Sequence, residues 1–303
     1  MRPQSVLGSL LAFASVAQST KVVLTNDDGW AVAQIRAQKD ALTAAGFSVV
    51  LSAPAENKSG TGSSSTTPSV LTSPCEYNSC PTGSPAEGFN ATDRSLNYVN
   101  GYPVDAVKYG IQTLAPKLLG SKPDLVISGP NVGSNLGVVT LVSGTVGAAS
   151  EAALEGIPAI AFNGVSTSEV SYTTLQSDPT SQATLATGIY ASAAIQFVQA
   201  LLADGNTPIL PPGIALNVNY PATDSCSAAS DFKYVLSRIY WNPLTADVHT
   251  CGSTTLPTES SVESTDGCYV SVSVFQGSNK LDANATVQAV VLDKLGSFLT
   301  CLP

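Results

Sequence analysis

Short apolar runs alternate with helix-forming segments along most of this chain. The runs occupy residues 21–25, 47–52, 124–128, 157–162 and 214–219, and helical spacing marks residues 31–45, 103–114, 143–156 and 181–203. Strands buried on both faces of a parallel sheet are continuously apolar, and the helices that connect them cover both faces. The pattern therefore predicts an α/β fold with three layers, in which a Rossmann-like, mostly parallel sheet lies between helices.

Two regions depart from this alternation. Residues 59–86 are rich in Ser, Thr, Gly and Pro, which predicts a long loop. Residues 231–275 show no helical spacing, and we expect them to form a β-hairpin extension. The sequence contains no internal repeat and no linker, so residues 18–303 are predicted to form a single domain.

The N-terminus has the features of a secretory signal peptide. Arg2 precedes an apolar run that ends at Ser15-Val16-Ala17, and small residues of this kind are typical of a cleavage site. The run is too short to span a bilayer. We predict a signal peptide over residues 1–17, cleaved after Ala17, and a secreted protein.

The cysteines agree with an oxidising compartment. They are even in number and none has CxxC spacing, so disulfides are expected rather than a zinc site. Cys75 and Cys80 are expected to close a local loop, and the others to tie together the C-terminal half: Cys226, Cys251, Cys268 and Cys301. Asn90 and Asn284 begin glycosylation sequons, and a third sequon at Asn57 is expected to be less accessible.

The charge balance limits the possible partners. The chain has 13 basic and 22 acidic residues, a net charge of −9, which argues against binding to a nucleic-acid polymer. An anionic substrate would need local positive charge, from a few side chains or a metal ion. The single histidine, His249, excludes a histidine-rich metal site.

Polar clusters follow three of the predicted strands. They are Asn26-Asp27-Asp28-Gly29, Asn57-Lys58-Ser59-Gly60 and the stretch from Ser128 to Gly137, which contains Asn131. Ligands of such sheets bind beyond the carboxyl ends of the strands. Two adjacent carboxylates with neutral oxygens suit a hard divalent ion such as Mg²⁺ or Mn²⁺. A structural alternative is that Asp28 caps the next helix and Asp27 forms an Asx turn.

Ser143-Gly144-Thr145 begins a helix of small residues. A helix N-terminus offers free N–H groups, and the two hydroxyls add donors, so this segment could bind phosphate. Alternatively, Ser143 is only an N-cap and the small residues let the helix pack closely on the sheet. The sequence has no GxGxxG or GxxxxGK[ST] motif, so neither dinucleotide binding nor a P-loop is indicated.

Taken in order, these motifs resemble the SurE family of metal-dependent phosphatases acting on nucleoside monophosphates. The resemblance extends from about residue 21 to 275 and includes Gly101-Tyr-Pro-Val-Asp105, Leu216-Asn217-Val218-Asn219 and Thr265-Asp266. The secreted, cysteine-containing form is similar to fungal SurE-like acid phosphatases. The family also implies dimers or higher assemblies formed through a C-terminal hairpin.

The resemblance implies a set of site residues. One divalent ion, Mg²⁺ or Mn²⁺, would be held by four side chains: Asp27, Asp28, Ser59 and Asn131. The phosphoryl group would be contacted by Asn135, Ser143, Gly144 and Thr145. Asp27 and Asp28 would be the catalytic residues, acting on a metal-activated water.

The chain also departs from the family pattern. Val138 and Val139 stand where the family often has acidic residues, and Val142 stands where it often has Tyr. The favoured function is a secreted phosphomonoesterase acting on nucleoside monophosphates or other small phosphate esters. The alternatives are a broad acid phosphatase without nucleotide preference and a non-catalytic secreted binding protein on the same fold.

Overall fold

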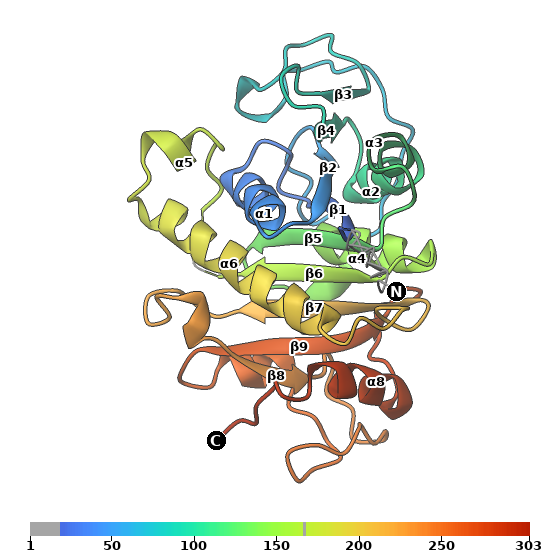
Figure 1. Ribbon diagram of the computed structural model, residues 1–303, viewed down its shortest axis with the longest axis vertical. Coiled ribbons are helices and arrows are strands. Elements are labelled where there is room, and N and C mark those ends of the chain that lie inside the picture. Colours follow the sequence, from blue (N-terminus) through green and yellow to red (C-terminus); the bar gives the residue numbers. More distant parts are fainter. Residues whose placement is uncertain (1–18, 166–167) are drawn as a thin grey trace, which may run out of the picture.

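The computed structural model describes residues 19–165 and 168–303, so the predicted signal peptide lies outside the described residues. Figure 1 shows one continuous sheet crossing the molecule, with strand order β3-β4-β2-β1-β5-β6-β7-β9-β8. The strands are β1 Lys21–Thr25, β2 Ser48–Pro54, β3 Glu87–Phe89, β4 Leu96–Val99, β5 Leu125–Val132, β6 Ala159–Gly164, β7 Ile214–Tyr220, β8 Lys233–Ser237 and β9 Tyr269–Gln276. All neighbours pair in parallel except β3 with β4 and β7 with β9. The predicted α/β fold with a mostly parallel sheet is confirmed.

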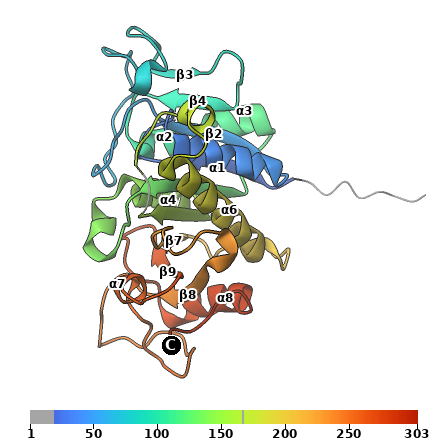
Figure 2. The same ribbon diagram turned by 90° about the vertical axis from the view of Figure 1, so that its left-hand side faces the viewer.

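Helices cover both faces of this sheet, and the alternation of side chains along β1 shows why. Val22 and Leu24 belong to one apolar cluster, whereas Val23 belongs to the other. The first cluster lies under α1 (Ala33–Ala44) and α6 (Gln182–Leu202), and the second lies under α2 (Pro103–Tyr109), α3 (Ala115–Leu119) and α4 (Gly144–Leu154). Figure 2 shows α4 and α6 on opposite sides of the sheet.

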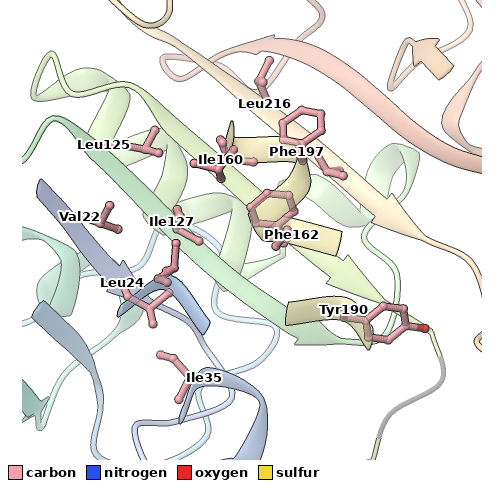
Figure 3. Close-up of a cluster of buried hydrophobic side chains, with 14 of the residues drawn as sticks. Val22, Leu24, Ile35, Leu125, Ile127, Ile160, Phe162, Tyr190, Phe197 and Leu216 are labelled. Carbon is pink, nitrogen blue, oxygen red and sulfur yellow. The ribbon is translucent and has the colours of Figure 1, made fainter. Parts of the chain in front are cut away.

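The long helix α6 is a core element. By length and composition it could cross a membrane, but half of its most apolar window is buried inside the domain. Its Phe197 lies beside Phe162, as Figure 3 shows, and its Tyr190 stacks on Tyr220 of β7. Phe162 and Phe197 meet edge to face, with ring centroids 5.8 Å apart.

The remaining helical segments are short or lie at the end of the chain. They are η1 Glu76–Asn78, η2 Gly110–Leu114, η3 Gly137–Leu141, α5 Thr174–Ser177, η4 Ala229–Asp231, α7 Glu259–Glu263 and α8 Ala285–Leu295. The helix predicted over 103–114 is therefore α2 continued by η2, a turn of π-helix.

Residues 231–275 differ from the expected hairpin. Their two strands, β8 and β9, pair in parallel, with Lys233 opposite Tyr269, so they are not the arms of one hairpin. Instead β9 pairs antiparallel with β7, and β8 forms the edge of the main sheet. The connection between them crosses from one end of the strands to the other and carries α7. This region thus extends the sheet instead of leaving it.

The described part of the chain contains three disulfides. Cys75 pairs with Cys80, as expected, and the other two bridges join Cys226 to Cys268 and Cys251 to Cys301. The last two lie wholly within the C-terminal half, in agreement with the sequence-based expectation. Three disulfides are typical of extracellular proteins.

Candidate active site

Asp27 and Asp28 lie directly after β1 and are almost completely buried. Oδ2 of Asp27 accepts a hydrogen bond from the Gly144 N–H at 3.1 Å, and Oδ1 accepts one from the Thr145 hydroxyl. Oδ2 of Asp28 accepts from the Val132 N–H at 3.0 Å, but its buried Oδ1 has no hydrogen-bond partner. A buried carboxylate oxygen without a donor is costly, so this atom is prepared for a ligand that the protein itself does not supply.

The structural alternatives for the aspartate pair are not observed. The N-cap of α1 is Val32, which makes no side-chain capping bond, so Asp28 is not a helix cap. The turn is held by Asn26, whose Oδ1 accepts from the Gly29 N–H at 3.2 Å and whose Nδ2 donates to the Gly29 carbonyl at 3.0 Å. Both aspartates are therefore free of the turn-forming roles that commonly explain such a motif.

Asn131 joins the aspartate pair through Thr145. Its Nδ2 donates to the carbonyls of Val132 and Gly133 at 3.2 and 2.8 Å, which turns Oδ1 the other way. Oδ1 lies 3.2 Å from the Thr145 hydroxyl, which also donates to Asp27. The structure thus brings together Asp27, Asn131 and Thr145, from the ends of two strands and the start of α4.

The first turn of α4 fits tightly against Asp27. Ser143 is its N-cap, with Oγ accepting from the Val146 N–H at 3.1 Å. A Cβ at Gly144 would lie 2.8 Å from the Cβ of Asp27 and 3.0 Å from its Oδ2, so only glycine fits here. The donors of Gly144 and Thr145 that were expected to contact phosphate are directed at Asp27 in this structure.

Ser59 is near this group but is held less firmly. The N–H of Lys58 donates to the Asp27 carbonyl at 2.7 Å, which fixes the backbone next to Ser59. The Ser59 side chain is exposed, and no bond joins its hydroxyl to either aspartate. Asn57 is also exposed, contrary to expectation, although its Nδ2 donates to Oε1 of Glu169 at 2.6 Å.

The electrostatics of the aspartate pair favour a cation. Burial raises the pKa of Asp28 well above its usual value, and the Asp27 carboxyl raises it further. Burial also raises the pKa of Asp27, and hydrogen bonds from Thr145 and Gly144 partly oppose this rise. Glu76, nearby in η1, has its pKa raised to about 7 by burial and by Glu169. A bound cation would stabilise the ionised form of all three carboxyls and so lower their pKa values.

The donor set fits a hard divalent ion of mixed ligation. Among the described residues, no group of three or more His, Cys, Asp or Glu side chains could hold a metal. The predicted set needs only two carboxylates, completed by the neutral oxygens of Asn131 and Ser59. The partnerless Oδ1 of Asp28 and the oriented Oδ1 of Asn131 are oxygen ligands of the kind that Mg²⁺ and Mn²⁺ prefer.

Asn135 belongs to a second polar group at the same edge of the sheet. Its Nδ2 donates to Oδ1 of Asn163 at 2.6 Å, and its N–H donates to Oδ1 of Asn219 at 2.8 Å. Asn163 in turn donates to Oδ1 of Asn217 at 2.9 Å, and Asn217 donates to the Asn135 carbonyl at 2.8 Å. We call these four residues the asparagine network.

Sequence reasoning missed two residues here, Asn163 of the asparagine network and its neighbour Glu259. Asn163 is the penultimate residue of β6, so the rule that points to strand ends would have found it. Glu259 starts α7 and accepts a bond from Asn217 at 2.7 Å, but no motif marks it. His249 is exposed.

Comparison with known proteins identifies the family of this chain. The family model described as Survival protein SurE matches residues 22–240. An acid phosphatase of Yarrowia lipolytica is 36% identical over 84% of this chain and 78% of its own length. A 5'-nucleotidase SurE of Lawsonia intracellularis is 34% identical over 66% of each chain.

Other bacterial relatives match over a shorter stretch. A 5'-nucleotidase SurE of Desulfatibacillum aliphaticivorans is 46% identical over 41% of this chain and 40% of its own length. A solved structure, the SurE protein from Aquifex aeolicus, superposes with a TM-score of 0.57 and 26% identity, covering 85% of this chain and 93% of that one. With the family model covering most of the chain, this protein belongs to the SurE family.

Proposed function

We propose that the chain is a secreted, metal-dependent phosphomonoesterase that hydrolyses nucleoside monophosphates or other small phosphate monoesters. Phosphomonoesterase activity agrees with its SurE relatives, which are named acid phosphatase and 5'-nucleotidase. The observation that carries the proposal is the buried, partnerless Oδ1 of Asp28 beside Asp27 and Asn131. Secretion is supported by the three disulfides.

The metal would be held by Asp27, Asp28, Asn131 and Ser59. A divalent ion at this place neutralises charge on the phosphoryl oxygens and lowers the pKa of a bound water. The protein's own part is to position these groups. Thr145 and Gly144 fix the Asp27 carboxyl, and the Val132 N–H fixes one oxygen of Asp28. Held in this way, the site needs little reorganisation when the substrate arrives.

The phosphoryl group would be contacted from α4 and from the loop that contains Asn135. The Ser143 oxygen already accepts from the Val146 N–H, so its hydroxyl hydrogen is available for donation. The partial positive charge at the N-terminus of α4 favours an anion beside it. Asn135, fixed by the asparagine network, would bind from the opposite side of the loop.

The test is phosphate release from an aryl phosphate by the purified secreted protein, with and without a chelator. We expect activity that EDTA abolishes and that added Mn²⁺ or Mg²⁺ restores. Absence of metal-dependent release across pH 4 to 8 would reject this function and favour a non-catalytic binding protein.

One observation favours the broader acid phosphatase as a second candidate. Between Asn135 and Ser143, the side chains of Val138, Val139 and Val142 are 71%, 44% and 55% exposed. The polar Thr140 of the same segment is fully buried and bonded to the Gly137 carbonyl at 2.7 Å. An apolar rim next to the site offers no hydrogen bonds to a nucleoside, and it suits esters with apolar leaving groups.

The two candidates differ in the ratio of kcat/KM for aryl phosphate to that for AMP. If the rim sets the preference, Val138→Asp with Val139→Asp should lower this ratio several-fold, because acidic side chains remove the apolar contact. Gln196→Glu with Gln199→Glu, on the exposed face of α6, is the matched control for two added charges. An unchanged ratio in the rim variant would leave nucleotides as the supported substrates.

A further inference from the structure

The carboxyl of Glu259 lies inside the protein, at the edge of the sheet where the site is built. Glu259 is the first residue of α7, and its side chain is 0% exposed. Within the described residues, no Lys, Arg or His side chain forms an ion pair with it. Burying a carboxyl without a cation beside it lowers stability, so we ask which part of the chain its hydrogen bonds hold in place.

Two of these bonds reach both sides of one residue, and a third comes from the Ser273 side chain on β9. Oε2 of Glu259 accepts from the Gly137 N–H at 3.3 Å, and Oε1 accepts from Nδ2 of Asn217 at 2.7 Å. The same Nδ2 of Asn217 donates to the Asn135 carbonyl at 2.8 Å. Glu259 therefore holds the backbone on both sides of Leu136, which we call a bracket. It binds the Gly137 N–H directly, and it is linked to the Asn135 carbonyl through Asn217.

The bracketed segment is the one that presents Asn135. Gly137 has a φ of +52°, so the chain turns sharply just after it, and a fixed N–H at this point fixes where the turn lies. On the other side, Asn163 and Asn219 hold the side chain and the N–H of Asn135. Of the side chains holding this segment, Glu259 is the one that carries a carboxyl.

We propose that Glu259 is a positioning residue that sets the affinity of the Asn135 segment for the phosphoryl group, an inference that rests on the proposed function. In the described part of the chain, Glu259 makes no hydrogen bond to Asp27, Asp28, Ser59 or Asn131, the four proposed metal ligands. A segment that binds the phosphoryl group equally in the ground state and the transition state changes KM and leaves kcat nearly unchanged.

The experiment replaces the carboxyl without changing its shape. In Glu259→Gln, the new amide N–H₂ must face either the Gly137 N–H or Nδ2 of Asn217, so one arm of the bracket is lost to a clash of donors. The matched control is Glu263→Gln, the same change at the other end of α7, where the side chain is half-buried and makes no hydrogen bond in the described part of the chain.

We expect Glu259→Gln to raise both KM and the inhibition constant of inorganic phosphate about tenfold. The value of kcat should stay within about twofold, and the Mn²⁺ concentration that gives half-maximal activity should not change, because the Glu259 side chain bonds to Gly137 and Asn217 and not to the four proposed metal ligands. The control should match the wild type in all four quantities. Asn217→Ala should reproduce the rise in KM, and the double variant should be no worse than Asn217→Ala alone.

Three outcomes would overturn the inference. They are wild-type KM and phosphate inhibition in Glu259→Gln, an equal loss in both glutamine variants, or a fall in kcat alone. If Glu259→Gln does not fold, Glu259→Asp serves instead, since it keeps the charge but is too short to hold both arms, and its KM should rise in the same direction.

A failure of the proposed function would look different. In that case the wild type releases no phosphate from any ester, and calorimetric titration of the Mn²⁺-treated protein with inorganic phosphate replaces the kinetics. Weaker phosphate binding by Glu259→Gln than by Glu263→Gln would still support the positioning role. Equal binding by the two variants, or none by the wild type, would reject it.

Discussion

Two groups of polar side chains lie at the same edge of the sheet, and they differ in how well their hydrogen bonds are satisfied. In the aspartate site, Oδ1 of Asp28 and the nearby hydroxyls of Thr25 and Ser128 have no partner among the described residues. In the asparagine network, Asn135, Asn163 and Asn217 are bonded to one another. Only Nδ2 of Asn219 is left without a partner there.

The difference indicates that the two groups have different roles. Unsatisfied buried oxygens and paired carboxylates cost stability, and a ligand that repays this cost binds strongly. A satisfied network has little to gain from a ligand, but it holds its members in one arrangement. We therefore regard the aspartate site as the place where an ion binds and the asparagine network as the frame beside it.

The largest effect is expected from Asp27→Asn. This change removes one of two charges from the proposed metal site, so kcat should fall at least about a hundredfold. The control is Asp124→Asn, a carboxylate at the opposite end of the sheet, where its Oδ2 accepts from the Lys21 N–H at 2.8 Å. Near-normal turnover in folded Asp27→Asn would show that the aspartate site is not where the ion binds, and the contrast with the asparagine network would be lost.

A smaller loss is expected from Gly144→Ala. The added Cβ would press on Asp27 at 2.8 Å and on Pro103 at 3.0 Å, displacing the carboxyl that α4 holds. We expect kcat/KM to fall about tenfold, since small misplacements of positioned groups are costly. Gly188→Ala, in α6 where the new Cβ meets nothing within 4 Å, should leave activity unchanged. Equal activity of the two variants would show that the contact between α4 and Asp27 is not needed.

The carboxyl of Glu259 should make stability depend on pH. Burial raises the pKa of Glu259 to about 8, with a further contribution from Asp282, so in the folded protein it keeps its proton above the pH at which it loses it in the unfolded chain. Between about pH 4.5 and 8 the folded state therefore binds more protons, and stability falls as pH rises.

Relative to Glu259→Gln, the wild type should lose about 1 kcal/mol of unfolding free energy per pH unit in this window. Urea unfolding of both proteins at pH 5, 6 and 7 measures the difference. If the unfolding free energies of the two proteins change in parallel with pH, Glu259 is ionised in the folded state. Its hydrogen bonds would then lower its pKa by more than burial raises it.

Much of this comparison could be predicted from the sequence. The strand at Lys21–Thr25 was predicted with its observed bounds, because an apolar run there ends abruptly at Asn26. The position of Asp27, Asp28 and Asn131 at one edge of the sheet followed from the rule that parallel strands share their carboxyl ends. A local pattern was sufficient wherever the residues that meet follow strands directly.

The rest depends on contacts that no local pattern describes. Strand β3, at Glu87–Phe89, is short and largely exposed, so it carries no apolar signal. The pattern at 231–275 indicated strands but not their direction, and the hairpin expectation was wrong because β8 pairs in parallel with β9. Glu259 reaches Asn217 and Gly137 across 42 and 122 residues of chain, and nothing in the sequence around it marks this meeting.

The smallest effect is expected on the stability of the Asp28→Asn variant. In Asp28→Asn, the Val132 N–H keeps an acceptor, while a buried carboxyl whose pKa is raised by burial and by Asp27 becomes neutral. Without metal, the unfolding free energy near pH 7 should therefore rise by about 1 kcal/mol, and the stabilisation that Mn²⁺ gives the wild type should disappear. Urea unfolding in EDTA and in Mn²⁺ measures both quantities, with Asp124→Asn as the control that keeps the metal effect. A loss of stability in EDTA, together with a retained response to Mn²⁺, would show that Asp28 is a structural residue and that the ion binds elsewhere.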